Sequence, residues 1–338
     1  MRYRAKLTPE TAESAIKEIK ELFQRALSSR LGLRRVTAPL FVLEGSGIND
    51  DLGGGCPPVS FEVDDLGGQR AEVVQSLAKW KRLKLADYNI APGYGLYTDM
   101  NAIRPHETLD ALHSLYVDQW DWEKSILPEQ RTVDYLKQTV NQIYEALLEV
   151  EAQLYAIHNH ITPALPPQIY FIHAEHLLQR YPTMSPKERE AAIAKEYGAV
   201  FIIGIGAPLS NGEPHDRRAV DYDDYTSVGQ DGLYGLNGDL ILWNSVLESP
   251  FELSSMGVRV DAKALRLQLS AAGLEQKAQL PYHKALLGGT LPESIGGGIG
   301  QSRLCMFLLR TAHIGEVQAS LWSEQMRSSL GAEGIFLK

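Results

Sequence analysis

The clearest chemical signal in the chain is the run at residues 296–303, Gly-Gly-Gly-Ile-Gly-Gln-Ser-Arg. Glycines let a backbone approach a ligand closely, and the apolar residues from Leu304 onward predict a helix whose N-terminus favours negative charge. A Walker loop would end in Gly-Lys-Ser/Thr, and a dinucleotide fingerprint would have another glycine three residues after Gly300. Neither pattern is present. Taken alone, the run is equally compatible with a tight turn before a helix, and its closing Arg303 is what favours a phosphate ligand.

A second candidate for phosphate binding is the segment Ile-Arg-Pro-His-Glu at 103–107, in which Arg104 precedes Glu107. Arginine suits this task because its planar fork can bind a phosphate bidentately without changing charge. The following stretch, 113–123, alternates in the manner of a strand. One face carries Leu115, Val117, Gln119, Asp121 and Glu123, and the other carries Tyr116, Asp118, Trp120 and Trp122.

Helices with clear start and stop signals surround these segments. Thr8 predicts an N-cap with proline at the next position, and Gly32 ends that helix. A long amphipathic helix is predicted from Thr132 to His158, and a capping box at Ser185 begins another that stops at Gly198. A basic helix carries Lys79, Lys81, Arg82 and Lys84, which we expect to be solvated with one lysine facing substrate.

Extended segments are predicted at 35–43, broken by Pro39, and at 72–75, 199–204, 239–243 and 251–260. Glycine-rich residues 45–55 and polar residues 210–231 are predicted loops, the second a mobile surface loop. Because strands and helices do not alternate regularly, a parallel doubly wound sheet is disfavoured and an α+β fold is favoured. We expect one catalytic domain over residues 1–338.

The composition is that of an ordinary globular protein. Its 338 residues include 33 basic and 42 acidic ones, and the net charge of -9 counts against nucleic acid as the main partner. Only Cys56 and Cys305 are present, which favours a reducing compartment. With no apolar run approaching 18 residues, we expect no membrane partner and a cytoplasmic location.

The spacing Gly-x-Gly-x-Gly-x-x-Arg that ends at Arg303 resembles motif 3 of the class II aminoacyl-tRNA synthetases, and Arg104 with Glu107 resembles their motif 2. The helix ending near Gly32 and the strand leading to Pro39 resemble motif 1, which carries the dimer interface in that class. All three occur in the expected order. The resemblance implies an antiparallel sheet flanked by helices, of the class II synthetase catalytic type, and a homodimer.

Longer phrases resemble the family of ammonia-dependent asparagine synthetases, or aspartate-ammonia ligases, in particular. They are Ser-Leu-Ala-Lys-Trp-Lys-Arg at 76–82, Tyr-Val-Asp-Gln-Trp-Asp-Trp-Glu at 116–123, Asp-Tyr-Asp-Asp at 221–224, Leu-Asn-Gly-Asp at 236–239 and Phe-Glu-Leu-Ser-Ser-Met-Gly-Val-Arg at 251–259. They span nearly the whole chain. The resemblance implies synthesis of asparagine from aspartate, ammonia and ATP through a β-aspartyl adenylate, with release of AMP and pyrophosphate.

The resemblance also implies roles for individual residues. Three arginines would bind the ATP phosphates, and two carboxylates would hold Mg²⁺. Polar residues, most of them from the sequence segments quoted above, would surround the amino acid. On the ATP side these are Arg104, Glu107, His113, Asp239, Glu252, Arg259, Gly298, Gly300 and Arg303, with Asp239 and Glu252 as the metal ligands. On the amino-acid side they are Asp50, Ser76, Lys81, Gln119, Asp121, Asp223 and Ser255. Arg104, Arg303, Lys81 and Asp50 are the expected catalytic residues, although Asp51 is an alternative to Asp50.

Other functions are less consistent with the sequence. Pairs of histidines at 158 and 160 and at 173 and 176 lack the spacing of a zinc site. A glutamine-dependent amidotransferase would need a reactive cysteine, typically at the mature N-terminus, but Arg2 follows Met1. A tRNA synthetase would need an added anticodon-binding domain, for which we expect no room before Thr8. A non-catalytic paralogue that senses aspartate, asparagine or an adenylate remains an alternative that the sequence does not exclude.

Overall fold

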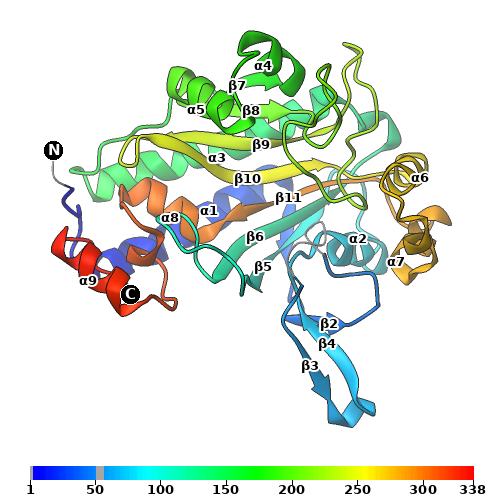
Figure 1. Cartoon of the computed structure of the whole chain (residues 1–338), viewed down its shortest axis with the longest axis horizontal. Helices are drawn as coiled ribbons and strands as arrows, with labels where there is room; N and C mark the ends of the chain where they lie inside the picture. The colour runs from blue at the N-terminus through cyan, green and yellow to red at the C-terminus, as the bar shows by residue number, and fades with distance from the viewer. Residues whose placement is uncertain (1–2, 51–56) are drawn as a thin grey trace.

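The computed structural model of the protein describes residues 3–50 and 57–338. The main feature of these residues is an eight-stranded sheet in which all neighbouring strands are antiparallel except the outermost pairs, β1–β5 and β7–β8 (Figure 1). The predicted α+β fold with an antiparallel core is therefore confirmed. In spatial order the strands are β1 (Leu33–Arg35), β5 (Gly95–Ile103), β6 (Tyr116–Ser125), β11 (Ser294–Gly300), β10 (Ser249–Val258), β9 (Asn237–Asn244), β8 (Ala199–Ile203) and β7 (Tyr170–His173).

Two long helices, α1 (Pro9–Leu31) and α3 (Val133–Ile157), pack together against one face of this sheet (Figure 1). Both begin where the sequence predicts, Thr8 at its predicted cap, and the Thr8 and Thr132 hydroxyls each accept a hydrogen bond from the backbone N–H three residues later. Gly32 ends α1 with φ of 69°, as predicted for a left-handed stop. Their apolar stripes and the sheet form the largest hydrophobic core.

Strand β6 divides its side chains between this core and the opposite face, as the alternation predicts. Trp120 and Trp122 are buried in the core, and the Trp120 ring lies 4.7 Å from that of Phe23 on α1. Gln119 and Asp121 therefore lie on the other face, where they line cavities. The strand thus anchors the sheet with one face and supplies polar groups with the other.

Helices α4 (Ala174–Arg180) and α5 (Pro186–Tyr197) cover the second face at the β7–β8 end of the sheet (Figure 1). Every residue of β8 is buried, because its side chains alternate between two cores. One core lies between the sheet and helices α1 and α3, and the other lies between the sheet and helices α4 and α5. The remaining helices are α2 (Ala78–Asp87), α6 (Ala262–Ala271), α7 (Pro281–Leu287), α8 (Gln301–Leu309) and α9 (Glu324–Ala332). In the part of the chain that the structure describes, no helix is both long and apolar enough to cross a membrane.

The extended segment predicted at 35–43 is interrupted around Pro39, as expected. It is divided between β1 of the main sheet, which ends at Arg35, and β2 (Phe41–Leu43), which joins β4 (Gln69–Val73) and β3 (Ser60–Val63) in a small sheet that projects from the body (Figure 1). Proline lacks the N–H that a continuous ladder needs, so the chain changes sheet there. The predicted glycine-rich loop at 45–55 lies partly outside the described residues.

Two expectations need correction. Helix α2 is not solvated, since the side chains of Lys79, Lys81 and Arg82 are all buried. The segment 210–231 is not simply a surface loop, because Asp221, among other residues of it, is buried. In both segments the polar residues face one another across the interior, an arrangement that periodicity cannot reveal.

Candidate active site

Two adjoining cavities lie on the polar face of the sheet. The larger has a volume of about 280 Å³ and the smaller about 120 Å³. Four residues line both cavities: Arg104, Gln119, Ser255 and Gly298. A molecule in the larger cavity would therefore meet a molecule in the smaller one at these four residues.

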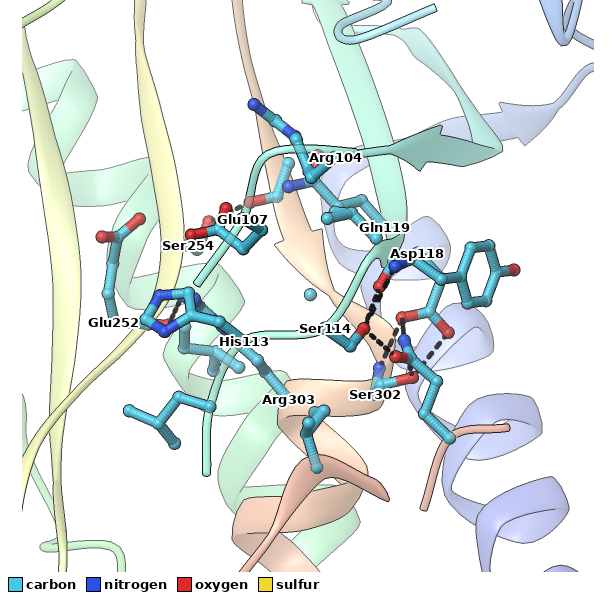
Figure 2. Close-up of a pocket in the computed structure, with 18 of the residues that line it drawn as sticks. Arg104, Glu107, His113, Ser114, Asp118, Gln119, Glu252, Ser254, Ser302 and Arg303 are labelled. Carbon is cyan, nitrogen blue, oxygen red and sulfur yellow. Dashed lines mark hydrogen bonds between the residues drawn. The ribbon is translucent and has the colours of Figure 1, made fainter. Parts of the chain in front are cut away.

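The larger cavity gathers seven of the nine residues predicted on the ATP side. Arg104, Glu107 and His113 come from the segment that joins β5 to β6, Glu252 from β10, and Arg303 from the first turn of α8 (Figure 2). Gly298 and Gly300 of β11 complete this set. The predicted strand-loop-strand around Arg104 is present, because its backbone N–H donates to the Leu115 carbonyl at 2.8 Å.

Arg104 is the charged residue common to the two cavities. Its Nε is buried, and no group among the described residues forms a hydrogen bond with it. Buried polar groups in proteins are nearly always hydrogen-bonded, so a buried donor of this kind indicates a ligand. A guanidinium at the junction of two cavities can hold an anion that extends from one into the other.

A dense hydrogen-bond network fixes the start of α8 beside the larger cavity (Figure 2). The Asp118 carboxylate accepts hydrogen bonds from the Ser302 N–H at 3.0 Å, from its hydroxyl at 2.8 Å, and from the Gln318 amide at 3.3 Å. The side chain of Arg303, the next residue, donates to the Glu252 carbonyl at 2.8 Å. The helix terminus that carries the predicted phosphate-binding arginine is thus held in place by side chains from β6 and the C-terminal segment.

The glycine run of β11 is a strand rather than a turn, and its glycines make room for neighbouring side chains. A Cβ at Gly298 would lie 2.3 Å from Oε1 of Gln119, which lines both cavities. A Cβ at Gly296 would lie 2.0 Å from Oε2 of Glu123 and 2.6 Å from Nη2 of Arg259. Contacts this short are not tolerated, so a side chain here would displace groups that build the site.

The smaller cavity is lined by six of the seven residues predicted on the amino-acid side. These are Asp50, Ser76, Gln119, Asp121, Asp223 and Ser255. Tyr222, which the predictions omit, also lines it, and its hydroxyl donates to Asp50 at 2.8 Å. The alternative Asp51 lies outside the described residues.

Lys81 is the predicted substrate residue that lines neither cavity. Its side chain is 0% exposed, pairs with Asp121 and donates to the Trp122 carbonyl at 2.8 Å. Burial lowers the pKa of Lys81 and raises that of Asp121, in each case against the attraction of the partner. Lys81 therefore contacts Asp121 of the cavity wall without lining the cavity itself.

A series of buried ion pairs extends from Lys81 to Asp239. Lys81 Nζ lies 3.7 Å from Glu123. Arg259 Nη2 lies 2.9 Å from Glu123 and pairs on its other side with Asp223, which is 3.3 Å from Arg218. Arg218 in turn lies 2.6 Å from Asp239. Arg259 and Asp239 are the two residues predicted to bind ATP that do not line the larger cavity. Arg259 lines the smaller cavity, and Asp239 lines neither.

Asp239 and Glu252 are the two residues predicted to hold Mg²⁺. They lie on the adjacent strands β9 and β10, and a β-bulge between Glu252 and Ser254 changes the register there. Burial, with a further contribution from Glu252, raises the pKa of Asp239 to about 6 against the opposing effect of Arg218. No cluster of three or more His, Cys, Asp or Glu suited to a metal occurs within the described ranges. Glu252 lines the larger cavity and Asp239 lies on the neighbouring strand, and a pair of carboxylates is a donor set that fits Mg²⁺, because this ion usually takes one or two carboxylates and completes its shell with phosphate oxygens and water.

Several residues that build the site were not predicted. Arg218 lies in a segment without periodicity, and no local signal distinguishes it from a surface arginine. Tyr222 and Glu123, by contrast, stand inside phrases at 221–224 and 116–123 that were already singled out. Ser114, Asp118, Ser302 and Gln318 meet only in three dimensions.

Comparison with known proteins identifies the family. A family model described as aspartate-ammonia ligase matches residues 10–334. This chain belongs to the aspartate-ammonia ligase family. It is 61% identical over 335 residues to the aspartate-ammonia ligase of Bacteroides fragilis, covering 99% of this chain and 97% of that one. It is 51% identical to the Bacillus cytotoxicus enzyme of the same name, covering 99% of each.

Solved structures with a similar fold are class II aminoacyl-tRNA synthetases. The asparaginyl-tRNA synthetase of Pyrococcus horikoshii, complexed with asparaginyl-adenylate, has a TM-score of 0.68 at 16% identity and covers 93% of this chain and 70% of that one. The aspartyl-tRNA synthetase of Entamoeba histolytica has a TM-score of 0.59 at 13% identity, covering 91% and 57%. At these identities the likeness establishes the fold, and the predicted class II type is confirmed.

Proposed function

We propose that the protein makes L-asparagine from L-aspartate, ammonia and ATP through a β-aspartyl adenylate. The observation that carries this mechanism is the pair of adjoining cavities with Arg104 at their junction. The larger cavity takes ATP and the smaller takes aspartate, so the α-phosphorus and the side-chain carboxylate meet beside the guanidinium. Family membership supports the overall reaction, and the adenylate bound by the Pyrococcus horikoshii neighbour supports the intermediate.

In the first step a β-carboxylate oxygen of aspartate attacks the α-phosphorus, and the bond to the bridging oxygen breaks to release pyrophosphate. Arg104 stabilises the negative charge that develops on the α-phosphate oxygens, and Arg303 holds the distal phosphates. In the second step ammonia attacks the β-carbonyl carbon, and the bond to the phosphate oxygen breaks to release AMP. Positioning and electrostatic stabilisation suffice for this chemistry, so no nucleophilic side chain is required.

Mg²⁺ is the proposed cofactor, and its proposed ligands are Glu252, which lines the larger cavity, and Asp239 on the neighbouring strand. When bound, the ion would neutralise charge on the phosphate oxygens of ATP. Arg218, which pairs with Asp239, keeps that carboxylate in position. We further propose a single catalytic domain, a cytoplasmic homodimer whose contact involves the end of α1 and β1, and no nucleic acid or membrane partner.

Ammonium is expected to support asparagine synthesis, whereas glutamine is not. The one cysteine among the described residues, Cys305, is fully buried, and burial raises the pKa of its thiol to about 12, so it cannot form a glutaminyl thioester. The assay measures asparagine formed from aspartate and ATP with ammonium or with ammonium-free glutamine. Comparable turnover with glutamine would overturn this part of the proposal.

Asp50→Asn is expected to raise the KM for aspartate or ammonium and to leave ATP binding nearly unchanged. Asp50 lines the smaller cavity, where its carboxylate accepts a hydrogen bond from Tyr222, and it does not line the larger cavity. Asparagine can keep the contact with Tyr222 but removes the negative charge. Steady-state kinetics with each substrate varied in turn would test this, and a loss confined to ATP affinity would contradict the assignment.

A further inference from the structure

Tyr222 is a residue of the smaller cavity to which the proposed function gives no role. It lines that cavity together with Asp50, and its hydroxyl donates a hydrogen bond to the Asp50 carboxylate at 2.8 Å. The two residues are 172 positions apart in the sequence. Their contact is therefore made by the fold, and it joins two separate parts of the cavity wall.

The position of the Tyr222 ring does not depend on its hydroxyl. The Val260 N–H donates to the Tyr222 carbonyl at 2.8 Å, and the Asp224 N–H donates to the Val258 carbonyl at 3.0 Å. These hydrogen bonds attach the segment to the end of β10. The guanidinium carbon of Arg259 lies 5.5 Å from the centre of the ring, an arrangement that favours a cation. The ring is thus held by backbone pairing and packing.

Asp50 approaches from the opposite wall. The side-chain oxygen of Asn49 accepts hydrogen bonds from the Asp50 N–H at 3.0 Å and from the Gln75 N–H at 2.7 Å, and the Asn49 amide donates to the Val73 carbonyl at 3.1 Å. These contacts tie the backbone of Asp50 to the end of β4. Its carboxylate extends from there to Tyr222, so the tyrosine hydroxyl helps to set the direction of this side chain.

The need of a tyrosine hydroxyl for an acceptor does not account for a carboxylate here. Tyr144 on α3 is 3% exposed, and a backbone carbonyl, that of Pro166, accepts from its hydroxyl at 2.6 Å. Burial, together with the carboxylates of Asp50 and Asp223, raises the pKa of Tyr222 well above its ordinary value of 10. Its phenol consequently stays protonated and remains a donor at the pH of an ordinary assay.

We propose, on the basis of the proposed function, that Tyr222 is a positioning residue whose hydroxyl holds the Asp50 carboxylate in the orientation that binds an ammonium group in the smaller cavity. A carboxylate forms strong, directional hydrogen bonds with such a group. Aspartate carries one as its α-ammonium, and the nitrogen substrate in its protonated form is another. Tyr222 acts through Asp50 and needs no contact with the reacting atoms.

The test uses Tyr222→Phe, which removes one oxygen and keeps the ring. KM and kcat for asparagine synthesis are measured with aspartate, ammonium and ATP varied in turn. The KM for the substrate whose ammonium group Asp50 binds is expected to rise about tenfold or more, as for loss of a hydrogen bond to a charged group. The KM for ATP and kcat should stay near the parent values. A rise confined to aspartate identifies its α-ammonium, and a rise confined to ammonium identifies the nitrogen substrate.

A double-variant comparison separates positioning from a structural role. Asp50→Ala removes the carboxylate through which Tyr222 acts, so adding Tyr222→Phe to it should lower kcat/KM no further. A tyrosine that only stabilises the fold would multiply the two losses. Tyr144→Phe is the matched control, because it also removes a tyrosine hydroxyl with a hydrogen-bond acceptor, and its kinetic constants should equal those of the parent.

The inference is overturned if Tyr222→Phe leaves the KM for aspartate and for ammonium unchanged, if it raises the KM for ATP equally, or if the two losses multiply. Should Tyr222→Phe not fold, Asp50→Glu decides, because it keeps the charge but displaces the carboxylate by one methylene from its place beside Tyr222. Parent KM values in Asp50→Glu would overturn the positioning role. Unchanged KM values in Asp50→Ala would instead refute the assignment of Asp50 in the proposed function, and the inference with it.

Discussion

Arg104→Ala is expected to lower the rate of adenylate formation by at least about 10²–10³, equivalent to roughly 2.7–4 kcal/mol, as for loss of a preorganised donor. The guanidinium is positioned where the two cavities meet, and its buried Nε has no hydrogen-bond partner among the described residues. The charge that it stabilises develops only in the transition state, so the loss should appear mainly in kcat. Aspartate-dependent exchange of pyrophosphate into ATP measures this step directly.

Arg104→Lys should recover only part of the rate, because an ammonium group is a point charge and cannot reproduce a bidentate fork. Arg180→Ala is a suitable control, since Arg180 is an exposed arginine paired with Glu196 far from the cavity lining. Full activity in Arg104→Lys would show that charge alone suffices at this position. Full activity in Arg104→Ala would remove Arg104 from the mechanism.

Arg259→Met is expected to destabilise the folded protein by about 3–5 kcal/mol, because it leaves buried carboxylates without their counter-ion. Arg259 is 2% exposed, contacts Glu123 at 2.9–3.1 Å and pairs with Asp223. The free energy of unfolding, measured by chemical denaturation at neutral pH, should fall accordingly. Arg259→Met combined with Glu123→Gln should recover part of the loss, since the double variant has one unpaired carboxylate fewer.

The destabilisation by Arg259→Met should also depend on pH. Burial alone raises the pKa of Glu123, but Arg259 and Lys81 outweigh burial and lower this pKa from its ordinary 4.5. A carboxyl with a lowered folded pKa stabilises the protein above its unfolded pKa, and that contribution is lost as pH falls through the folded value. The difference between parent and variant should therefore shrink below about pH 4.5. A difference that grows in acid would contradict the ion-pair account.

Local features of the fold were predictable from sequence because short-range physical chemistry determines them. Thr8, Thr132 and Ser185 cap helices where their side chains reach nearby backbone N–H groups, and Gly32 ends α1 because it adopts a positive φ. The alternation in β6 likewise predicted that Trp120 and Trp122 share one face of the strand and that Gln119, Asp121 and Glu123 share the other. Each of these signals depends on a few neighbouring residues.

Ion pairs between residues far apart in the sequence could not be predicted from local patterns. The lysines of α2 form no apolar stripe, so their burial depends on carboxylates about 40 and 142 residues away, Asp121 and Asp221. The glycines of β11 suggested a turn because the side chains that require them belong to another strand. Nothing in the sequence around Arg218 indicated that this residue belongs to the site. The family resemblance predicted most residues of the candidate site, and those predicted for ATP and for the amino acid largely line different cavities in the structure.

The most direct test of the central claim is the identity of the nucleotide products after complete turnover of aspartate, ammonium and ATP. A ligase can activate a carboxylate at the α-phosphorus, releasing pyrophosphate, or at the γ-phosphorus, releasing ADP. Arg104 lines both cavities, so on the proposed placement of the substrates it would contact the phosphate next to the amino acid, and the sequence has no Walker lysine for the distal phosphates. The account predicts one AMP and one pyrophosphate for each asparagine, and ADP with phosphate in their place would contradict it.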